Sequence, residues 1–280
     1  MKRFVLAVTL LAGCTGLLRA APSGFDAFTI LQSDPELGGL SGIEMTDDGS
    51  KLTAISDRGV LWTANVQRRN GVIADIVDLT PTPIRKAAGR GTPDAEGLAI
   101  SADGTRYVSF EGRHSVNVIA ADGSTTELTR AKAFRALQSN SSLEALAIDA
   151  VGTLYTIPER SGRMTRPFPV YRLQNDRWNI AFTIPRRGPF LVVGADIGPD
   201  DRFYVLERHF TGFGFQSRVR RFELDGSEET AIIQSATGQH DNLEGISVWG
   251  PKDALRMTLV SDDNFRFFQR TELVEYDLPR

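Results

Sequence analysis

The sequence predicts an all-β fold, a single β-propeller of about five four-stranded blades. Three observations support it. Five segments repeat one pattern at intervals of about 50 residues, each interval has room for four short strands, and the residues left over at the two ends together make one more interval. An irregular β-sandwich with evenly spaced turns is the alternative. A sixth, degenerate blade around residues 60–92 or 160–170 stays open.

Each repeat opens with a short apolar segment, at residues 40–43, 95–98, 143–146, 193–196 and 243–246. In most repeats a polar turn follows, and then a second apolar strand that ends on an acid. When Ser41, Glu96, Glu144, Val193 and Glu244 are taken as equivalent, the spacings are 55, 48, 49 and 51 residues. The spacing is that of propeller blades.

The third repeat shows four strands most clearly, at residues 146–148, 154–157, 170–173 and 180–184. Residues 25–31 are expected to complete the last blade beside residues 272–278, because an unclosed ring would leave strand edges unpaired. Residues 129–141 are an exception to the repeat, since their Ala, Arg, Lys and Leu content favours a helical turn or a long loop. One propeller domain over residues 25–280 is therefore expected.

Residues 1–20 read as an export signal, with Lys2 and Arg3 followed by an apolar run over residues 4–11. The segment Leu11-Ala12-Gly13-Cys14 resembles a bacterial lipobox, which predicts lipidation of Cys14 and a tether to the membrane. The alternative is an incidental cysteine, with cleavage near Ala20. We expect a periplasmic or cell-envelope protein that is lipid-anchored, or otherwise secreted.

Composition limits the partners. Cys14 is the only cysteine, so an intrachain disulfide is impossible, and a net charge of −3 offers no broad basic field for nucleic acid. No other apolar stretch approaches the length that crosses a bilayer, so membrane contact is expected only through the lipid anchor. A soluble, monomeric domain is the expectation.

Acidic residues recur at two positions of the repeat. The start of a blade's first strand and the end of its antiparallel second strand lie at the same end of the central channel, so these acids are predicted to ring one mouth. Arginines follow four of them. The acids are Asp57, Glu96, Glu111, Glu144, Glu159, Glu207, Glu244 and Asp262, and the arginines are Arg58, Arg113, Arg160 and Arg208.

Crowded carboxylates need a cation to offset their repulsion. Oxygen ligands without cysteine favour Ca²⁺ over Mg²⁺. The predicted ligands are Glu96, Glu144, Glu244, Asp57, Asp262 and Asn242. The four arginines are predicted to hold phosphate or carboxylate oxygens of a small anionic substrate. Alternatively, the acid–arginine pairs are strand-end bridges that hold neighbouring blades in register.

A metal beside arginines can polarise a phosphoryl or acyl centre and activate water. Glu144, Glu244 and His209 are the predicted catalytic residues. His114 and His240 fall near the same rim, and each histidine is either a general base or a packing residue. Residues 212–215, Gly-Phe-Gly-Phe, form a lid over the mouth or a plain turn. No nucleophile elbow, P-loop or dinucleotide fingerprint is present.

Several motifs resemble the bacterial phytase-like family described as having esterase-like activity. They are Gly39-Leu40-Ser41-Gly42-Ile43, Ser56-Asp57-Arg58-Gly59, Asp94-Ala95-Glu96-Gly97-Leu98, Ser142-Leu143-Glu144-Ala145-Leu146 and Asp241-Asn242-Leu243-Glu244-Gly245-Ile246. The resemblance spans about residues 25–276 and implies a propeller, export, and hydrolysis of phosphate or other esters. Its calcium-dependent phytase relatives hold several calcium ions with acid clusters.

Gluconolactonases and paraoxonases are a second resemblance, and it implies a calcium site from Glu96, Asn242, Glu244 and Asp262. Ser41 and Val193 interrupt the row of glutamates, which argues against a fully symmetric metal ring. The leading functional prediction is a phosphate-ester or related ester hydrolase with a channel-bound Ca²⁺. The alternatives are a non-catalytic propeller of the cell envelope that binds a ligand or protein, and a Ca²⁺-dependent lactonase.

Overall fold

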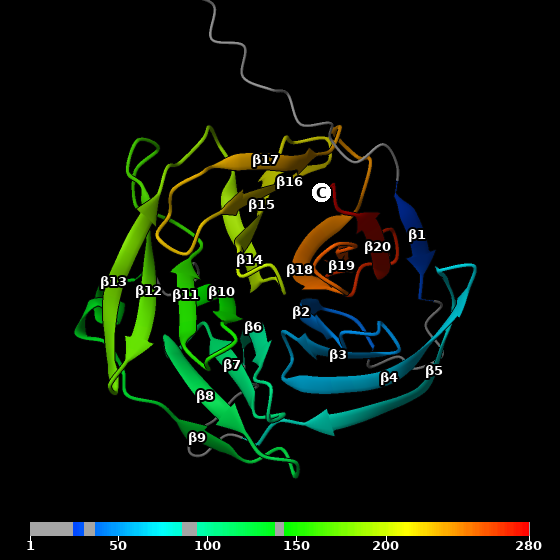
Figure 1. Ribbon diagram of the computed structural model, residues 1–280, viewed down its shortest axis with the longest axis horizontal. Coiled ribbons are helices and arrows are strands. Elements are labelled where there is room, and N and C mark those ends of the chain that lie inside the picture. The colour runs from blue at the N-terminus through cyan, green and yellow to red at the C-terminus, as the bar shows by residue number, and fades with distance from the viewer. Residues whose placement is uncertain (1–24, 31–36, 86–93, 138–142, 280) are drawn as a thin grey trace, which may run out of the picture.

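The computed structural model describes residues 25–30, 37–85, 94–137 and 143–279, which form a ring of five four-stranded blades (Figure 1). The predicted five-bladed propeller is confirmed, and the β-sandwich alternative is excluded. The export signal and Cys14 lie outside the described residues.

Each of blades 1 to 4 is a continuous run of four strands, ordered from the axis outward. Blade 1 contains β2 (Leu40–Met45), β3 (Lys51–Ser56), β4 (Val60–Arg69) and β5 (Val72–Pro83); blade 2 contains β6 (Ala95–Ile100), β7 (Arg106–Phe110), β8 (Ser115–Ile119) and β9 (Thr125–Glu127); blade 3 contains β10 (Leu143–Ile148), β11 (Leu154–Pro158), β12 (Phe168–Gln174) and β13 (Arg177–Ile184); blade 4 contains β14 (Leu191–Ile197), β15 (Phe203–Phe210), β16 (Phe215–Phe222) and β17 (Thr230–Gln234).

Blade 5 closes the ring with strands from both ends of the chain. It contains β18 (Asn242–Trp249), β19 (Arg256–Asp262), β20 (Glu272–Asp277) and, on its outer edge, β1 (Asp26–Thr29). Asp26 lies opposite Glu275 and Thr29 opposite Glu272 in an antiparallel ladder, so the predicted closure is confirmed. The segments considered for a sixth blade hold β4 and β5 and lead into β12.

A buried ion pair ties blade 5 to blade 1. Arg68 on β4 donates hydrogen bonds of 2.8 Å to both carboxylate oxygens of Glu275 on β20, and its guanidinium lies 4.7 Å from the Trp249 ring. The Glu275 side chain is 1% exposed. Elsewhere, apolar clusters between neighbouring blades form the core, such as the packing of Tyr204 and Leu206 of blade 4 against Leu259 of blade 5.

The inner strands pack so closely that they almost close the axis. A Cβ on Gly97 would lie 2.8 Å from the Leu146 nitrogen, and one on Gly194 would lie 2.6 Å from the Glu244 carbonyl oxygen. A cavity among the inner strands has a volume of about 10 Å³, with Glu144 among its lining residues. That space holds at most one water. The axis itself therefore offers little room for a bound cation.

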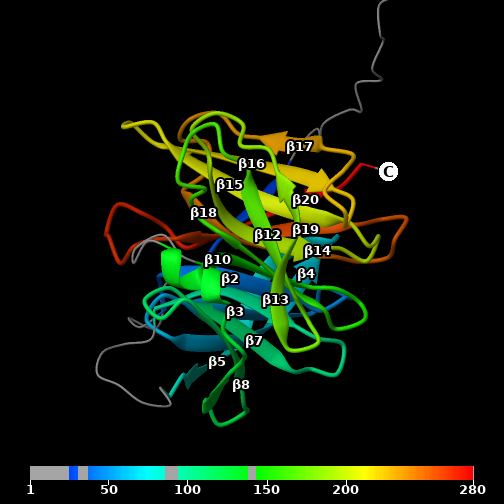
Figure 2. The same cartoon turned by 90° about the vertical axis from the view of Figure 1, so that its left-hand side faces the viewer.

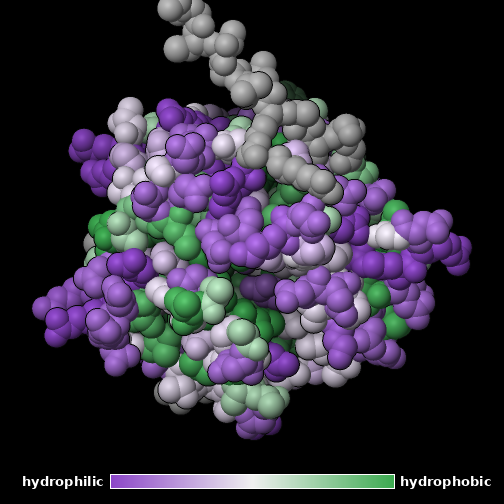
Figure 3. All heavy atoms as spheres, viewed as in Figure 1, coloured by the Kyte–Doolittle hydropathy of each residue, from purple (hydrophilic) through white to green (hydrophobic). Residues whose placement is uncertain are grey.

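The two faces of the ring differ. In Figure 2 the loop of residues 263–271 (red-orange) and the tip of the β15–β16 hairpin (yellow) project from the left-hand side, and the C-terminal end lies on the right. Figure 3 shows the opposite face, where hydrophilic side chains predominate around smaller apolar patches. Asp-Gly turns such as those at Asp48 and Asp103 lie on this second face, and each carboxylate accepts hydrogen bonds from a nearby Ser or Thr.

One helical element is described, a 3-10 helix (Lys132–Ala136) inside the segment predicted to hold a helical turn. Phe134 anchors it, since its fully buried ring lies 5.2 Å from that of Tyr171. Residues 138–141 of that prediction lie outside the described residues. Within the described ranges, the chain has no helix of sufficient length and hydrophobicity to cross a bilayer.

Candidate functional site

Carboxylates from four blades converge at one end of the axis. We call this group the acid mouth: Asp57, Asp94, Glu96, Glu111, Glu144, Glu159, Glu244 and Asp262. Burial raises the pKa of Glu96 well above its ordinary value, and the nearby carboxylates of Glu144 and Glu244 raise it further. Glu144 shows the same direction of pKa shift, from burial first and then from Glu159 and Glu244. The inner strands β6, β10 and β18 thus bring their first glutamates together, as the repeat predicts.

The carboxylates of Asp94, Glu96 and Glu111 form the tightest group. Each offers one oxygen, and these oxygens lie within 4.8 Å of one another. Asp94 and Glu96 are two positions apart around the start of β6, so they share a face of the strand. Asp94 was not among the predicted metal ligands, although this spacing was visible in the sequence.

Asp57 and Asp262 flank the mouth where blade 5 meets blade 1. Burial, together with the charge of Glu244, raises the pKa of Asp262 to about 8. Burial raises the pKa of Asp57 to about 6, although the adjacent Arg58 lowers it in part. The Asp57 Oδ1 atom is buried and has no hydrogen-bond partner in the described part of the chain. These carboxyl groups sit where ionisation is unfavourable without a cation.

Arg208 supplies a positive charge inside the mouth. It extends from β15, and its Nη1 donates to Glu244 and, at 2.7 Å, to Asn242 Oδ1, while its Nη2 lies 3.6 Å from Glu159. Burial lowers its pKa, but the carboxylates of Glu244 and Glu159 outweigh that effect and raise it. Two predicted metal ligands, Asn242 and Glu244, are therefore already bonded to Arg208.

Glu207 does not belong to the acid mouth, contrary to the expectation from the repeat. Its carboxylate is completely buried in blade 4, where it accepts hydrogen bonds from Arg218 Nε at 2.8 Å, Arg220 Nε at 2.7 Å and Arg220 Nη2 at 2.6 Å. These ion pairs join two strands of one blade, whereas the alternative interpretation expected bridges between neighbouring blades. Glu207 is a structural residue.

The other three predicted anion-binding arginines occupy different surroundings. Arg160 Nε lies 3.0 Å from Glu159, and the Arg160 side chain is 48% exposed. The Arg58 guanidinium lies over the Phe265 ring, 3.2 Å from its centroid. Arg113 is exposed on the β7–β8 turn. Only Arg160 and Arg208 line the same pocket.

The three histidines also differ. His240 is buried against the rings of Phe25 and Tyr276, and its Nε2 lies 2.8 Å from the Tyr276 hydroxyl. Burial lowers the pKa of His240 to about 4, so the packing interpretation fits this residue. His114 lies on the β7–β8 turn. His209 is half-buried, 5.7 Å from the Phe190 ring, in the wall of the pocket described next.

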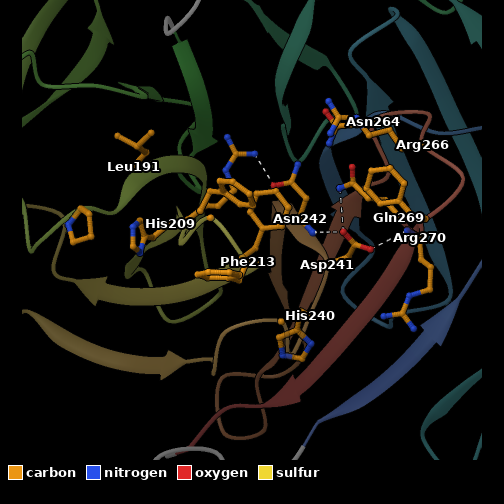
Figure 4. A pocket seen from close by; sticks show the side chains of 18 of the residues that line it. Leu191, His209, Phe213, His240, Asp241, Asn242, Asn264, Arg266, Gln269 and Arg270 are labelled. Carbon is orange, nitrogen blue, oxygen red and sulfur yellow. Dashed lines mark hydrogen bonds between the residues drawn. The ribbon is translucent and has the colours of Figure 1, made fainter.

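A pocket of about 890 Å³ opens beside the acid mouth, between blades 4 and 5. In Figure 4, Phe213 lies on one side of Asn242, and Gln269 and Arg270 lie on the other. Asp241 ties the second side to the start of β18, since it accepts hydrogen bonds from Gln269 Nε2 at 3.1 Å and from the Arg270 backbone nitrogen at 2.9 Å. Half of its phenylalanines and arginines come from two loops outside the repeat: Phe213, Phe268, Arg266 and Arg270. Residues 212–215 were predicted as a lid over the mouth or a plain turn, and residues 266–270 were assigned to no site.

The raised pKa of Asp262 predicts how stability depends on pH. The folded state keeps this carboxyl protonated up to about pH 8, whereas the unfolded chain releases the proton near 3.8. The folded state therefore binds one more proton in this range, and stability falls as pH rises through it, by about 1.4 kcal/mol per pH unit. Asp262→Asn should flatten that fall in urea denaturation with a chelator present. Glu44 and Asp196 also have raised pKa values, and both remain in the variant, so some fall should persist. Equal slopes of stability against pH in the two proteins would contradict the prediction.

The chain is similar in structure to several known propellers. Among solved structures, a luciferin-regenerating enzyme aligns over 90% of this chain and 95% of its own with 12% identity and a TM-score of 0.51. The RRP9 WD40 repeats align over 93% and 99% with 10% identity and a TM-score of 0.51. Virginiamycin B lyase from Staphylococcus aureus aligns over 91% and 100% with 10% identity and a TM-score of 0.49. At these identities the likeness to the first two structures shows the propeller fold alone.

No curated protein matches the sequence. A family model does match residues 35–265, which is most of the chain and includes every residue of the acid mouth. Its description is "Esterase-like activity of phytase". The chain therefore belongs to the phytase-like family.

Proposed function

We propose that this protein is an exported, lipid-anchored hydrolase of phosphate esters or related esters, assisted by Ca²⁺ at the acid mouth. The observation that carries the proposal is the convergence of Glu96, Glu144 and Glu244 from three blades beside a pocket that Arg160 and Arg208 also line. The mass of the mature N-terminus would test lipidation of Cys14.

The residues at the mouth fit a calcium ion. The donors are carboxylate oxygens, which Ca²⁺ prefers, and those of Asp94, Glu96 and Glu111 are close enough together to share one ion. The Asp57 oxygen without a partner and the raised pKa values of Glu96 and Glu144 are what a cation would relieve. When bound there, Ca²⁺ would offset the carboxylate charge and polarise an ester oxygen.

The protein's own groups have separable tasks in this proposal. Arg160, with nearly half of its side chain exposed, would hold the anionic group of the substrate. Arg208, which lines the same pocket, would also face the anionic group while it donates hydrogen bonds to Asn242 and Glu244. Glu144, a buried carboxylate of the mouth, would be a calcium ligand, because a cation there relieves the burial and repulsion that raise its pKa. His209, in the pocket wall, would accept a proton from the attacking water.

A calcium-dependent thermal shift tests the metal site. Saturating Ca²⁺, at about 100 times its Kd, should stabilise the wild type by about 2.7 kcal/mol, or roughly 5 to 10 °C in Tm. Glu144→Gln and Glu244→Gln should lose most of that shift, and Glu229→Gln, an acid in blade 4 away from the mouth, should keep it. A wild type without a shift, or equal shifts in all four proteins, would contradict the proposal.

Turnover is the second part of the same experiment. With Ca²⁺ present, the wild type should hydrolyse at least one of phytate, an aryl phosphate, an aryl carboxylate ester and a lactone above background, and the two mouth variants should not. The panel also separates the lactonase alternative. Background rates on every substrate would leave the non-catalytic ligand-binding propeller, which the existing ion pairs between Arg208 and the mouth favour.

A further inference from the structure

We infer that the pocket between blades 4 and 5 binds an anion that carries an aromatic or other flat apolar group. The apolar group would lie against four phenylalanines and the charge against the arginines. The inference deepens the proposed function. It rests on that proposal in one respect, that this pocket is the substrate site. It names a substrate class, amphiphilic esters, in place of highly hydrated polyol phosphates.

The phenylalanines form what we call the aromatic wall: Phe210, Phe213, Phe215 and Phe268. Three of them are unusually exposed for such large apolar side chains, at 59% for Phe210, 99% for Phe213 and 64% for Phe268. The Phe210 and Phe215 rings lie 5.1 Å apart. Scattered exposed phenylalanines need no explanation, but several around one pocket indicate a surface that an apolar partner covers.

Hydrogen bonds hold the loops that carry these rings, so their exposure is built into the fold. The Thr211 nitrogen and hydroxyl both bond to the Gly214 carbonyl oxygen, at 3.0 and 2.9 Å, and this closes the turn that presents Phe213. In the other loop, Asp263 accepts hydrogen bonds from the Phe265 nitrogen at 3.0 Å and from the Thr271 hydroxyl at 3.1 Å. Phe268 is therefore presented by a loop fixed at both ends.

The remaining lining favours an anion. Four arginines and two carboxylates line the pocket: Arg160, Arg208, Arg266 and Arg270, with Glu159 and Asp241. Asp241 already accepts three hydrogen bonds, from the Asn242 nitrogen, Gln269 and the Arg270 nitrogen, so it offers little to a ligand. Arg160 and Arg270 are paired with Glu159 and Glu272, but their side chains are 48% and 59% exposed, so an anion in the pocket would meet two solvent-accessible guanidinium groups.

A single ligand has to contact both the aromatic wall and the arginines. The cavity, at about 890 Å³, has room for a ring and an acid group together. A polyol phosphate would satisfy the arginines but leave the phenylalanine rings in water. A flat apolar group would remove ring area from water, and this burial favours binding. The lining thus selects anions with an apolar substituent.

Binding of non-hydrolysable phosphonates by calorimetry tests the inference without turnover. The wild type should bind phenylphosphonate at least about tenfold more tightly than methylphosphonate. Phe213→Ala and Phe268→Ala should each lose most of that ratio. Phe267→Ala is the matched control, because Phe267 is fully exposed next to Phe268 but lines a different pocket, together with Arg58 and Asp263. Its ratio should change less than twofold.

Equal affinities for the two phosphonates, or equal losses in all three variants, would overturn the inference. A second pattern would also overturn it: neither phosphonate binds, the wild type binds phosphatidylcholine–phosphatidylglycerol vesicles tightly, and all three variants bind them more weakly. The rings would then contact a membrane. The result is independent of catalysis. Background hydrolysis with a retained phenyl preference refutes the proposed function alone, whereas hydrolysis without that preference refutes only this inference.

Discussion

Glu207→Gln is expected to destabilise the domain by about 3 to 5 kcal/mol, because it removes the negative charge that two buried guanidinium groups share. Arg220 is 1% exposed and Arg218 8% exposed, so water cannot replace the lost carboxylate. For a domain of this size the loss corresponds to a fall in Tm of roughly 6 to 20 °C. Thermal and urea denaturation of the two proteins measure it.

Glu229→Gln is the matched control for this substitution. Glu229 pairs with Arg187 and with the same Arg220, both at 2.8 Å, but its side chain is 25% exposed. Solvent screens that pair, so the expected loss is about 1 kcal/mol or less. Similar losses of stability in the two variants would show that burial does not determine how much the Glu207 ion pairs contribute to the free energy of unfolding.

Arg208→Gln is expected to change calcium binding and anion turnover in opposite directions. The arginine bonds to Glu244 and lies 3.6 Å from Glu159, so its removal leaves more uncompensated negative charge at the mouth. Loss of one positive charge at this range should tighten Ca²⁺ binding by about tenfold. The hydrolysis rate at saturating Ca²⁺ should fall by about 100-fold, since the substrate's anionic group loses a positive partner.

Calcium titration by calorimetry and initial rates on the best ester measure the two effects. Arg202→Gln serves as the control, because Arg202 pairs with Glu223 on the surface of blade 4 and should alter neither value. If Ca²⁺ affinity and rate fell together in Arg208→Gln, Arg208 would be maintaining the shape of the mouth rather than balancing its charge.

The sequence was informative where the structure follows the repeat. Strand positions, blade number and the pairing of β1 with β20 all follow from a period of about 50 residues, because every blade must present its first strand to the same axis. The convergence of Glu96, Glu144 and Glu244 follows for the same reason. Position in the repeat sets which end of a strand a residue occupies.

Position in the repeat does not reveal what a side chain meets across the strands. Glu207 matches Glu159 in the alignment of repeats, but Arg218 and Arg220 lie two positions apart on one face of β16 and bind it. That alternation was visible in the sequence, whereas the register that aligns it with Glu207 was not. Residues 212–215 were predicted as a lid or a turn, but the pocket itself was missed because Phe213 and Phe268 lie on loops that no other blade shares.

The nearly closed axis has a consequence for how any ligand travels. Inner-strand glycines such as Gly97 and Gly194 bring neighbouring backbones together, and this blocks passage from one face of the ring to the other. A ligand that enters at the carboxylates must therefore leave through the same opening. A released product would therefore compete with the next substrate molecule for that opening, so entry and exit share one path.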